Sequence, residues 1–258
     1  GISTGYGDLD RTITGLNKSD LILVAARPGM GKTAFALNIA ANVALRGKKT
    51  VAVFSLEMSR EQLMNRLFAA EGGIDSLKLL TGELSTEDWG KVADLSPIFG
   101  ASSLYMDDTA GITVAEMKAK LRRVRDLGLV VIDYLQLMSS SRRSENRVQE
   151  VSEITRSLKI MAKELNVPVI TLSQLSRGPD SRSDHRPMLS DLRESGSIEQ
   201  DADIVLFLYR EAYYEKERED QSETECIVAK NRHGETGKID LRWDGRYTRF
   251  FSVDRSRE

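Results

Sequence analysis

The stretch Ala26-Arg27-Pro28-Gly29-Met30-Gly31-Lys32-Thr33 decides the fold of this chain. It follows an apolar run at residues 21–25 and opens a segment of helical periodicity at 34–45. A strand, a glycine-rich loop and a helix in this order are the context that a phosphate-binding P-loop requires. Ala26 stands where the usual pattern has its first glycine, and we expect this small residue to fit. A plain glycine turn is the alternative, which the flanking strand and helix disfavour.

The P-loop pattern predicts which atoms would bind a nucleotide. Successive backbone N–H groups of residues 26–33 would surround the β-phosphate, and the N-terminus of the following helix would add partial positive charge. Lys32 would reach the β- and γ-phosphates, and the hydroxyl of Thr33 would bind Mg²⁺. We therefore predict that this stretch binds ATP, or another nucleoside triphosphate, together with Mg²⁺.

The size and composition fit one globular domain without a membrane segment. Of 258 residues, 40% are hydrophobic and 29% charged, as in ordinary soluble domains. No apolar run approaches the roughly 20 residues of a membrane helix, and the N-terminal residues 1–5 do not form a signal peptide. A single cysteine, Cys226, cannot form an internal disulfide and reads as a buried small hydrophobe, which predicts a reducing, cytoplasmic location.

The charge balance and the ligand supply narrow the function further. The formal net charge is −2, so any nucleic-acid contact has to come from a local basic patch. Two histidines and one cysteine are too few soft ligands for a zinc site.

Apolar runs and capping patterns predict strands that alternate with helices. Strands are expected at 21–25, 50–56, 104–106, 129–132, 169–172 and 204–208, and helices at 34–47, 59–70, from 85 to before Pro97, at 113–126 and at 147–165. Residues 1–20, 139–146, 176–194 and 211–225 read as turns, loops or exposed polar segments. Strands at 226–229 and 238–243 precede a two-residue turn, Asp244-Gly245, into a last strand at 246–251. This order predicts an α/β three-layer sandwich, with a mostly parallel central sheet and antiparallel C-terminal hairpins.

Three polar side chains end predicted strands, which is where such sheets bind ligands. Asp133 follows the apolar run 130–132 in a Walker B pattern that would bring a carboxylate to Mg²⁺; a turn or N-cap aspartate is the alternative. Glu57 ends the strand directly after the P-loop helix. We expect this adjoining strand to place Glu57 near the γ-phosphate, where it can orient water and accept its proton; a glutamate that stabilises a helix N-terminus is the alternative. Gln174 would hydrogen-bond the γ-phosphate and report its loss, unless it is simply solvated.

Lys230 and Arg232 stand at alternate positions in the loop between two C-terminal strands. Two cations on a rigid hairpin suit a role in a neighbouring subunit, where an arginine finger at the γ-phosphate is worth about 10³–10⁵ in rate. The residues alone leave open that both are merely exposed basic side chains.

Several further stretches form a recognisable set with the P-loop. They are Ser3-Thr4-Gly5 with Leu9-Asp10, residues 25–33, SLEMS at 55–59, IDYLQL at 132–137, SQLSR at 173–177, DLRESGSIEQDAD at 191–203 and AKNRHG at 229–234. Through them the chain resembles, nearly end to end, the motor domain of the DnaB-type bacterial replicative helicases. Many families share the P-loop, whereas the combination, above all the string at 193–203, is specific.

The resemblance implies a RecA-like P-loop NTPase fold and an ATP-dependent DNA helicase activity. Such a motor is a hexameric ring that hydrolyses nucleoside triphosphate between subunits, moves along single-stranded DNA and unwinds the duplex at the replication fork. The family's catalytic glutamate falls on Glu57, its Mg²⁺-associated aspartate on Asp133 and its sensor glutamine on Gln174. Its trans-acting lysine and arginine fall on Lys230 and Arg232.

The resemblance also implies a DNA loop of the central channel at Arg193, Glu194 and Gly196. Gly196 would let backbone amides approach phosphates, Arg193 would supply charge and Glu194 would hold that arginine in place. No aromatic residues interleave with this loop, so we expect a sequence-independent grip on the DNA backbone and no base stacking. The implied partners are single-stranded DNA, further copies of the chain in a homo-hexamer, a helicase loader and a primase.

We expect residues 1–258 to form a single motor domain, excised from a longer protein. The N-terminal scaffold domain and linker helix of full-length family members are missing, so we expect these residues alone to stay monomeric or to assemble weakly. Two other classes stay open. A RecA-type recombinase would share Lys32, Glu57 and Asp133 but lack the string at 193–203, and a non-catalytic docking module would not need these residues at all.

Overall fold

The computed structural model of the protein describes residues 1–133 and 146–253, except for the side chains of residues 193–195. All but the last residue of the predicted loop at 139–146 lies outside the described residues.

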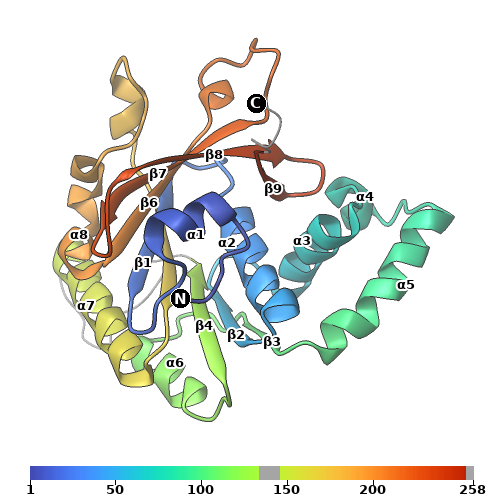
Figure 1. Ribbon diagram of the computed structural model, residues 1–258, viewed down its shortest axis with the longest axis horizontal. Coiled ribbons are helices and arrows are strands. Elements are labelled where there is room, and N and C mark those ends of the chain that lie inside the picture. Colours follow the sequence, from blue (N-terminus) through green and yellow to red (C-terminus); the bar gives the residue numbers. More distant parts are fainter. Residues whose placement is uncertain (134–145, 254–258) are drawn as a thin grey trace.

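Nine strands of the described residues form one sheet in the order β3-β2-β4-β5-β1-β6-β7-β8-β9 (Figure 1). Their bounds are β1 (Leu21–Ala26), β2 (Thr50–Ser55), β3 (Leu104–Asp107), β4 (Leu127–Asp133), β5 (Val169–Gln174), β6 (Ile204–Tyr209), β7 (Glu223–Asn231), β8 (Gly237–Asp244) and β9 (Arg249–Ser252). Strands β3 to β6 in this order are parallel, and β7, β8 and β9 are antiparallel. The predicted sheet is therefore confirmed.

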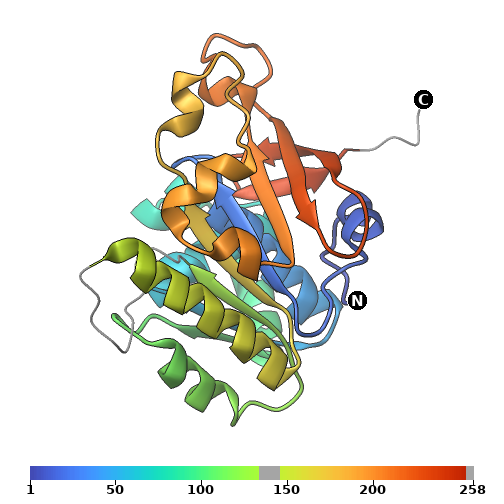
Figure 2. The same cartoon turned by 90° about the vertical axis from the view of Figure 1, so that its left-hand side faces the viewer.

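Helices cover both faces of the sheet and complete the three layers, as Figures 1 and 2 show. One face carries α1 (Gly7–Ile13), α2 (Lys32–Ala41), the π-helical turn η1 (Asn42–Arg46), α3 (Arg60–Gly72), α4 (Ser76–Thr81) and α5 (Thr86–Ala101). The other face carries α6 (Val114–Leu121), α7 (Arg147–Leu165) and α8 (Ile198–Asp201). Short 3₁₀ turns lie at η3 (Gly178–Ser181), η4 (Leu189–Ser195) and η5 (Glu211–Tyr213).

Strand β1 shows why the sequence makes a buried parallel strand. All six of its residues are buried. Leu21, Leu23 and Ala25 pack into the core on the α7 side, and Ile22, Val24 and Ala26 into the core on the α2 side. Helices on both faces explain the continuous apolar run, because neither side of the strand meets water.

Four predicted boundaries were wrong. Helix α5 continues through Pro97, where the hydroxyl of Ser96 donates to the Val92 carbonyl (2.7 Å) close to the hydrogen bond that proline cannot make. Helix α6 ends at Leu121 instead of near Asp126, which has a left-handed φ of 55°, and Gly128 lies in β4. The turn after β8 spans four residues, 245–248, so β9 begins at Arg249.

Three α-helices escaped the sequence analysis: α1, α4 and the four-residue α8. The stretch at 1–20 contains α1, whose only apolar signal is the buried pair Leu9 and Ile13 at helical spacing. Helix α4 buries no residue, so the sequence carries no periodicity that reveals it. Together with α5 it forms a projection at the side of the molecule (Figure 1).

The P-loop helix α2 is buried along its whole length, because the C-terminal strand β9 packs against it in addition to α3, β1, β4 and β5. Phe250 of β9 packs edge-on against Phe35 of α2, with 5.5 Å between ring centroids. The Phe250 amide also donates to the Asn38 side chain (2.8 Å). The first and last parts of the chain thus hold the P-loop helix between them.

Replacing Phe250 by alanine should destabilise the fold strongly. The ring is 2% exposed and contacts Phe35 and Trp243, so Phe250→Ala should lower the free energy of unfolding by about 3–5 kcal/mol. The matched control is Phe251→Ala: this neighbouring ring is 38% exposed, and the loss should stay below about 1 kcal/mol. Denaturant titration followed by circular dichroism measures both, and equal losses would contradict the packing described above.

Candidate functional site at the carboxyl end of the sheet

The P-loop has the backbone geometry that a close approach of phosphate requires. Gly29 and Gly31 adopt φ angles of 82° and 93°, which favour glycine over every other residue. A Cβ on Gly31 would also lie 2.9 Å from the ring of Phe250. Met30 between them is buried in the core, and Pro28 is exposed. Met30 therefore anchors the loop in the core, and the part of the loop at Pro28 is open to solvent.

Lys32, Thr33 and Asp133 meet at this edge of the sheet, as predicted. The hydroxyl of Thr33 donates to one carboxylate oxygen of Asp133 (3.1 Å). Lys32 Nζ lies 3.9 Å from the other oxygen, Oδ1, which accepts no hydrogen bond from the described part of the chain. A buried carboxylate oxygen that accepts no hydrogen bond, with a hydroxyl beside it, is suited to bind Mg²⁺ directly or through one of its bound waters.

The surroundings of Asp133 disfavour the ionised form of its carboxyl group. Burial raises the pKa of this carboxyl above its ordinary value, although Lys32 and the Thr33 hydroxyl act to lower it; the negative charge of Glu57 raises it further. The pKa of Arg66 on α3 is lowered by burial, and the same two carboxylates act against that shift. Arg66 is therefore a cation of this site that the sequence analysis missed, because nothing in the pattern of α3 distinguishes it.

Glu57 reaches the site by a different route from the one predicted. Strand β2 does not adjoin β1, because β4 and β5 lie between them. The expectation of an adjoining strand was wrong: β2 pairs with β4, and the Leu56 amide donates to the Asp133 carbonyl (2.7 Å). Glu57 is consequently an exposed carboxylate next to Asp133.

Gln174 lies beside the first residue of the P-loop. It is the last residue of β5 and pairs in register with Ala26 of β1. The next amide, that of Leu175, donates to the Ala26 carbonyl (2.9 Å). The loop that follows Gln174 therefore begins in direct contact with the P-loop.

The side chain of Arg27 turns away from the loop interior. Its guanidinium donates to the Leu175 carbonyl (2.7 Å) and forms an ion pair with Asp180 (3.1 Å). Only the backbone of Arg27 is then available to a phosphate. The side chain instead ties the P-loop to the segment after β5.

Two aromatic residues and an arginine that the sequence analysis missed lie next to the P-loop glycines. Arg210 donates to the Gly29 carbonyl (2.9 Å) and lies over the ring of Trp243, 5.7 Å from its centroid. Added Cβ atoms would lie 3.7 Å from Tyr213 at Gly29 and 3.5 Å from Trp243 at Gly31. Arg210 follows β6, Tyr213 belongs to η5 and Trp243 to β8, so no local motif reveals them.

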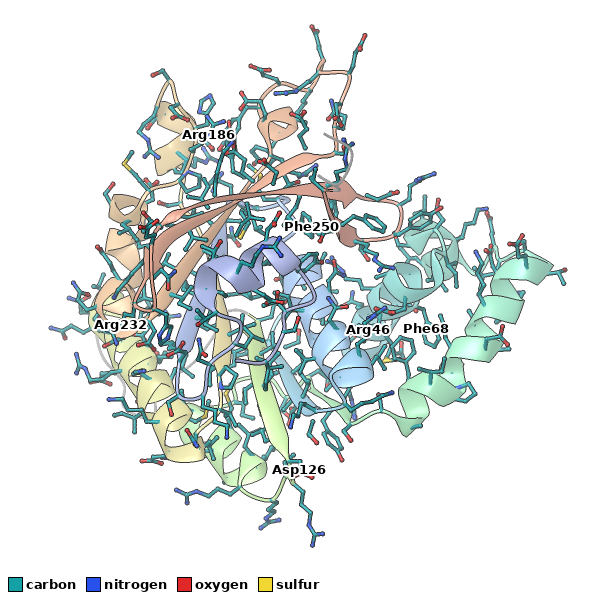
Figure 3. The ribbon with its side chains drawn as sticks, viewed as in Figure 1. Arg46, Phe68, Asp126, Arg186, Arg232 and Phe250 are labelled. Carbon is teal, nitrogen blue, oxygen red and sulfur yellow. The ribbon has the colours of Figure 1, made fainter. Side chains whose placement is uncertain are left out.

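Lys230 and Arg232 lie at the opposite end of the sheet from Lys32. Asn231 pairs with Ile204, which pairs with Ile22 near the start of β1. About four residues of strand, roughly 13 Å, then separate that level from the P-loop. Lys230 belongs to β7 itself, which corrects its predicted place in the loop, and Arg232 follows directly at the end of the strand (Figure 3). Neither cation can serve the P-loop of its own chain.

Both cations are held by the segment around α8. Lys230 Nζ donates to the Glu199 carbonyl (2.6 Å), and Arg232 donates to the Gln200 carbonyl (2.9 Å) and to the carboxylate of Asp203. Burial acts to raise the pKa of Asp203, but hydrogen bonds from Lys159 and the Leu21 amide, with the charges of Lys159 and Arg232, lower it below its ordinary value.

The predicted DNA loop is described only at Gly196, because the side chains of Arg193 and Glu194 are outside the described part of the structure. Gly196 has φ 67° and ψ −132°, and a Cβ there would lie 2.3 Å from the Ser152 hydroxyl and 2.8 Å from the Val148 carbonyl. The close contact with α7 by itself requires glycine at this position. The role of the loop in DNA binding stays a prediction.

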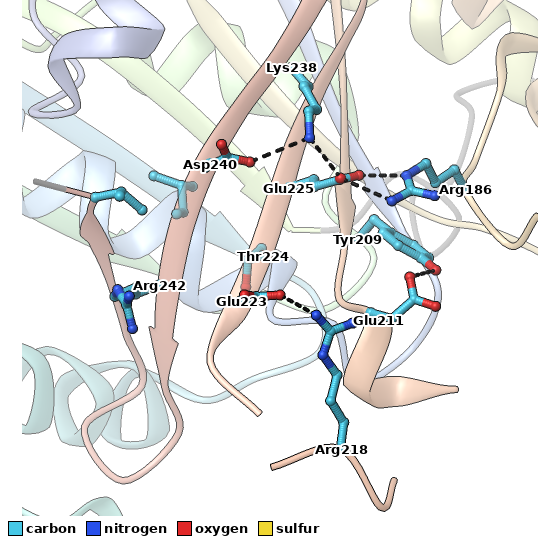
Figure 4. A pocket seen from close by; sticks show the side chains of 12 residues that line it. Arg186, Tyr209, Glu211, Arg218, Glu223, Thr224, Glu225, Lys238, Asp240 and Arg242 are labelled. Carbon is cyan, nitrogen blue, oxygen red and sulfur yellow. Dashed lines mark hydrogen bonds and ion pairs between the residues drawn. The ribbon is translucent and has the colours of Figure 1, made fainter. Parts of the chain in front are cut away.

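A pocket over β7 and β8 lies apart from the P-loop (Figure 4). Most of its charged groups pair with one another: Glu225 accepts from Arg186 (2.7 Å) and Lys238 (3.2 Å), and Arg218 pairs with Glu223. Arg242 also lines the pocket, and it makes no ion pair among the described residues.

Within residues 1–133 and 146–253, no three metal-binding side chains cluster, and no helix is both long and apolar enough to cross a bilayer.

Comparison with known proteins identifies the family. The family model described as DnaB-like helicase C terminal domain matches residues 1–252. The chain belongs to this family. It is 55% identical over 259 residues to the replicative DNA helicase DnaC of Bacillus subtilis (strain 168), and 54% identical to the replicative DNA helicase DnaB of Geobacillus stearothermophilus. Each alignment covers 99% of this chain and 57% of the relative, so the chain spans little more than half of these relatives.

Solved structures show the same fold. A DnaB-like replicative helicase, studied with its interactions with primase, superposes with a TM-score of 0.93 at 41% identity, covering 98% of this chain and 62% of that one. A solved ATPase domain matches equally well and is covered to 91%. The RadB recombinase, with a TM-score of 0.61 and 20% identity, shares the RecA-like fold only.

Replacing Asp133 should stabilise the nucleotide-free protein at neutral pH. Because its pKa is raised, ionisation of Asp133 weakens the fold as pH rises through that pKa. Asp133→Asn removes the charge and keeps an acceptor for Thr33. We expect a higher Tm than wild type at pH 8, and a gain that shrinks as pH is lowered toward about 4, the usual aspartate range.

Asp203→Asn is the matched counterpart with the opposite sign. The pKa of Asp203 is lowered, so its stabilisation is present above the usual aspartate range and is lost as pH falls through the lowered pKa. The variant should have a lower Tm than wild type at pH 8, and the deficit should shrink on acidification. Scanning calorimetry from pH 8 down to about 2, below the usual aspartate range, measures both series; shifts of the same sign at pH 8 would contradict these charge environments.

Proposed function

We propose that residues 1–258 act as one motor domain of an ATP-dependent replicative DNA helicase, which hydrolyses nucleoside triphosphate between the subunits of a hexameric ring and moves along single-stranded DNA. The observation that carries the proposal is the separation of two half-sites. A P-loop with Lys32, Thr33 and Asp133 lies at one end of the sheet, and two cations lie at the other.

The first half-site binds Mg²⁺–ATP. The backbone of residues 26–33 surrounds the phosphates, Lys32 reaches the β- and γ-phosphates, and Thr33 and Asp133 hold Mg²⁺, which neutralises the charge that develops in phosphoryl transfer. The exposed Glu57 orients the attacking water and accepts its proton. Gln174 contacts the γ-phosphate, and its position next to Ala26 lets it pass the loss of that phosphate to the segment that follows.

The base of the nucleotide lies against the group formed by Arg210, Tyr213 and Trp243. These residues lie next to Gly29 and Gly31, and aromatic or guanidinium planes there offer stacking to any purine or pyrimidine. This arrangement favours tolerance of several nucleoside triphosphates.

The second half-site acts on the neighbouring subunit. Lys230 and Arg232 reach the γ-phosphate held by the P-loop of the next protomer, because they cannot reach their own. An interface that joins two different faces of the same chain gives a ring when the rotation between neighbouring protomers closes. Residues around Gly196 then line the channel and bind the DNA backbone, and a helicase loader and a primase are the expected protein partners. A solved DnaB-like helicase studied with primase supports the last point.

Mixing two inactive variants tests the shared site. Lys32→Ala loses ATP hydrolysis through its own P-loop, and Arg232→Ala loses it because the neighbour lacks its arginine. In rings assembled from equal amounts of both, an intact P-loop meets an intact arginine at about one interface in four, so steady-state ATPase should recover to a clear fraction of wild type. Light scattering verifies assembly of every sample.

The control is each variant alone, assembled and with only a small residual hydrolysis. Absence of recovery in mixed rings would show that Lys32 and Arg232 serve the same chain and would refute the proposed ring mechanism. Normal turnover of the Lys32→Ala variant would refute the P-loop assignment.

Arg193→Ala should weaken binding of single-stranded DNA uniformly across sequences. Each subunit would lose one phosphate contact. The slope of log K against log salt should therefore become shallower by about one for each bound subunit. Fluorescence anisotropy with a labelled oligonucleotide at several salt concentrations measures the slope. Arg11→Ala, which removes a surface arginine paired with Asp8 on α1, is the control, and an unchanged slope for Arg193→Ala would contradict the channel-loop assignment.

A further inference from the structure

Asp203 is a buried carboxylate whose partners converge from three elements. It is 3% exposed and accepts hydrogen bonds from the Leu21 amide of β1 (2.8 Å) and from Lys159 Nζ of α7 (2.7 Å). The third partner of the Asp203 carboxylate is the guanidinium of Arg232. The Arg232 amide also donates to the Asp203 carbonyl (3.1 Å), so this arginine is bound to Asp203 through both its backbone and its side chain.

The grip on Arg232 leaves part of its guanidinium available. One terminal nitrogen donates to Asp203 and the other to the Gln200 carbonyl (2.9 Å). An arginine has five N–H donors, and these two bonds occupy only some of them. The Arg232 side chain is still 46% exposed, so the remaining donors can meet a group outside the chain.

The carboxylate that holds Arg232 is itself rigidly placed. Lys159 also donates to the Ser19 carbonyl (2.7 Å), and the Leu21 amide belongs to a strand buried on both faces. A long arginine side chain samples many rotamers when it is free, and a fixed acceptor removes most of them before the phosphate arrives. Fixing a charge in advance is what transition-state stabilisation demands.

We infer that Asp203 is a positioning residue for trans-acting catalysis: it holds the Arg232 guanidinium in the orientation in which it meets the γ-phosphate of the neighbouring subunit. The inference rests on the proposed function, since it assumes that Arg232 acts on a neighbour. Lys230, which donates to the Glu199 carbonyl, is held by the same segment, so both cations share one support.

This support adjoins the predicted DNA loop. Helix α8 begins two residues after Gly196. Its Glu199 and Gln200 carbonyls accept the hydrogen bonds from Lys230 and Arg232. The Ser197 amide donates to the Ser152 hydroxyl of α7 (3.0 Å). A displacement of the loop would therefore move the carbonyls to which the cations are bound.

The test is a double-mutant cycle in assembled rings of the complete protein, with Asp203→Asn, Arg232→Ala and the double variant. ATPase kinetics with single-stranded DNA should give Asp203→Asn a kcat about tenfold below wild type, with KM for ATP changed less than about twofold, because the P-loop is intact. In the Arg232→Ala background, Asp203→Asn should cause no further loss of kcat, since the residue that it positions is gone.

The matched control is Asp201→Asn. Asp201 ends the same helix and accepts from the hydroxyls of Thr155 and Ser197 (2.8 and 2.7 Å), but it hydrogen-bonds neither Lys230 nor Arg232 among the described residues. Its kcat should stay within about twofold of wild type. A role of Asp203 in stability alone would lower kcat by the same factor with and without Arg232, and that additive result would overturn the inference.

Two further outcomes keep this inference separate from the proposed function. If Arg232→Ala rings hydrolyse ATP normally, the proposed trans mechanism fails; if they lose activity and Asp203→Asn rings do not, only the positioning role fails. Should Asp203→Asn fail to assemble because Lys159 is left without its carboxylate, Asp203→Asn with Lys159→Met removes both charges and is measured in the same cycle. Failure of both to fold would show that Asp203 serves folding, and would likewise overturn the inference.

Discussion

The contact between Thr33 and Asp133 sets the geometry on which the rest of the site depends. The two residues are 100 positions apart in sequence, and only the parallel pairing of β1, β5 and β4 brings their strand ends to one edge. Burial then makes the charge of Asp133 unfavourable without a cation, and its second oxygen has no hydrogen-bond donor among the described residues. The fold thus keeps a carboxylate in a state that a divalent ion improves.

Candidate functional residues lie at both ends of the sheet, because its C-terminal strands are antiparallel. A purely parallel sheet would carry every functional loop at its carboxyl edge. Strand β7 reverses direction and takes Lys230 and Arg232 to the amino edge, beside the starts of β1 and β6. One chain then carries the P-loop and the two cations at opposite ends of the sheet, as the head-to-tail assembly proposed above requires.

The sequence predicted those features that depend on local pattern, and it failed where distant segments decide. The continuous apolar runs placed β1, β4 and β5 to within a few residues, and the capping box of Ser59 and Gln62 gave the start of α3. Helix α4 has no buried face, so no periodicity in the sequence reveals it, whereas α5 was predicted from residue 85 and only its end was wrong, because it runs through Pro97.

The same division holds for the site. Lys32, Thr33 and Asp133 lie in motifs whose strand context is local, and the structure brings them together as predicted. Strand order cannot be read from chain order, which is why Glu57 was expected on a neighbour of β1. Arg66, Arg210 and Trp243 come from elements whose own sequences give no sign of the P-loop. Their importance appears only once the strands are placed side by side.

The single cysteine has a practical consequence for spectroscopy. Cys226 lies in β7, is fully buried and has a pKa raised by burial to about 12, so almost none of it is thiolate at neutral pH. Maleimide dyes and thiol-reactive spin labels should not react with Cys226 while the protein stays folded. A cysteine introduced at an exposed position would then carry the label alone, without prior removal of the native thiol.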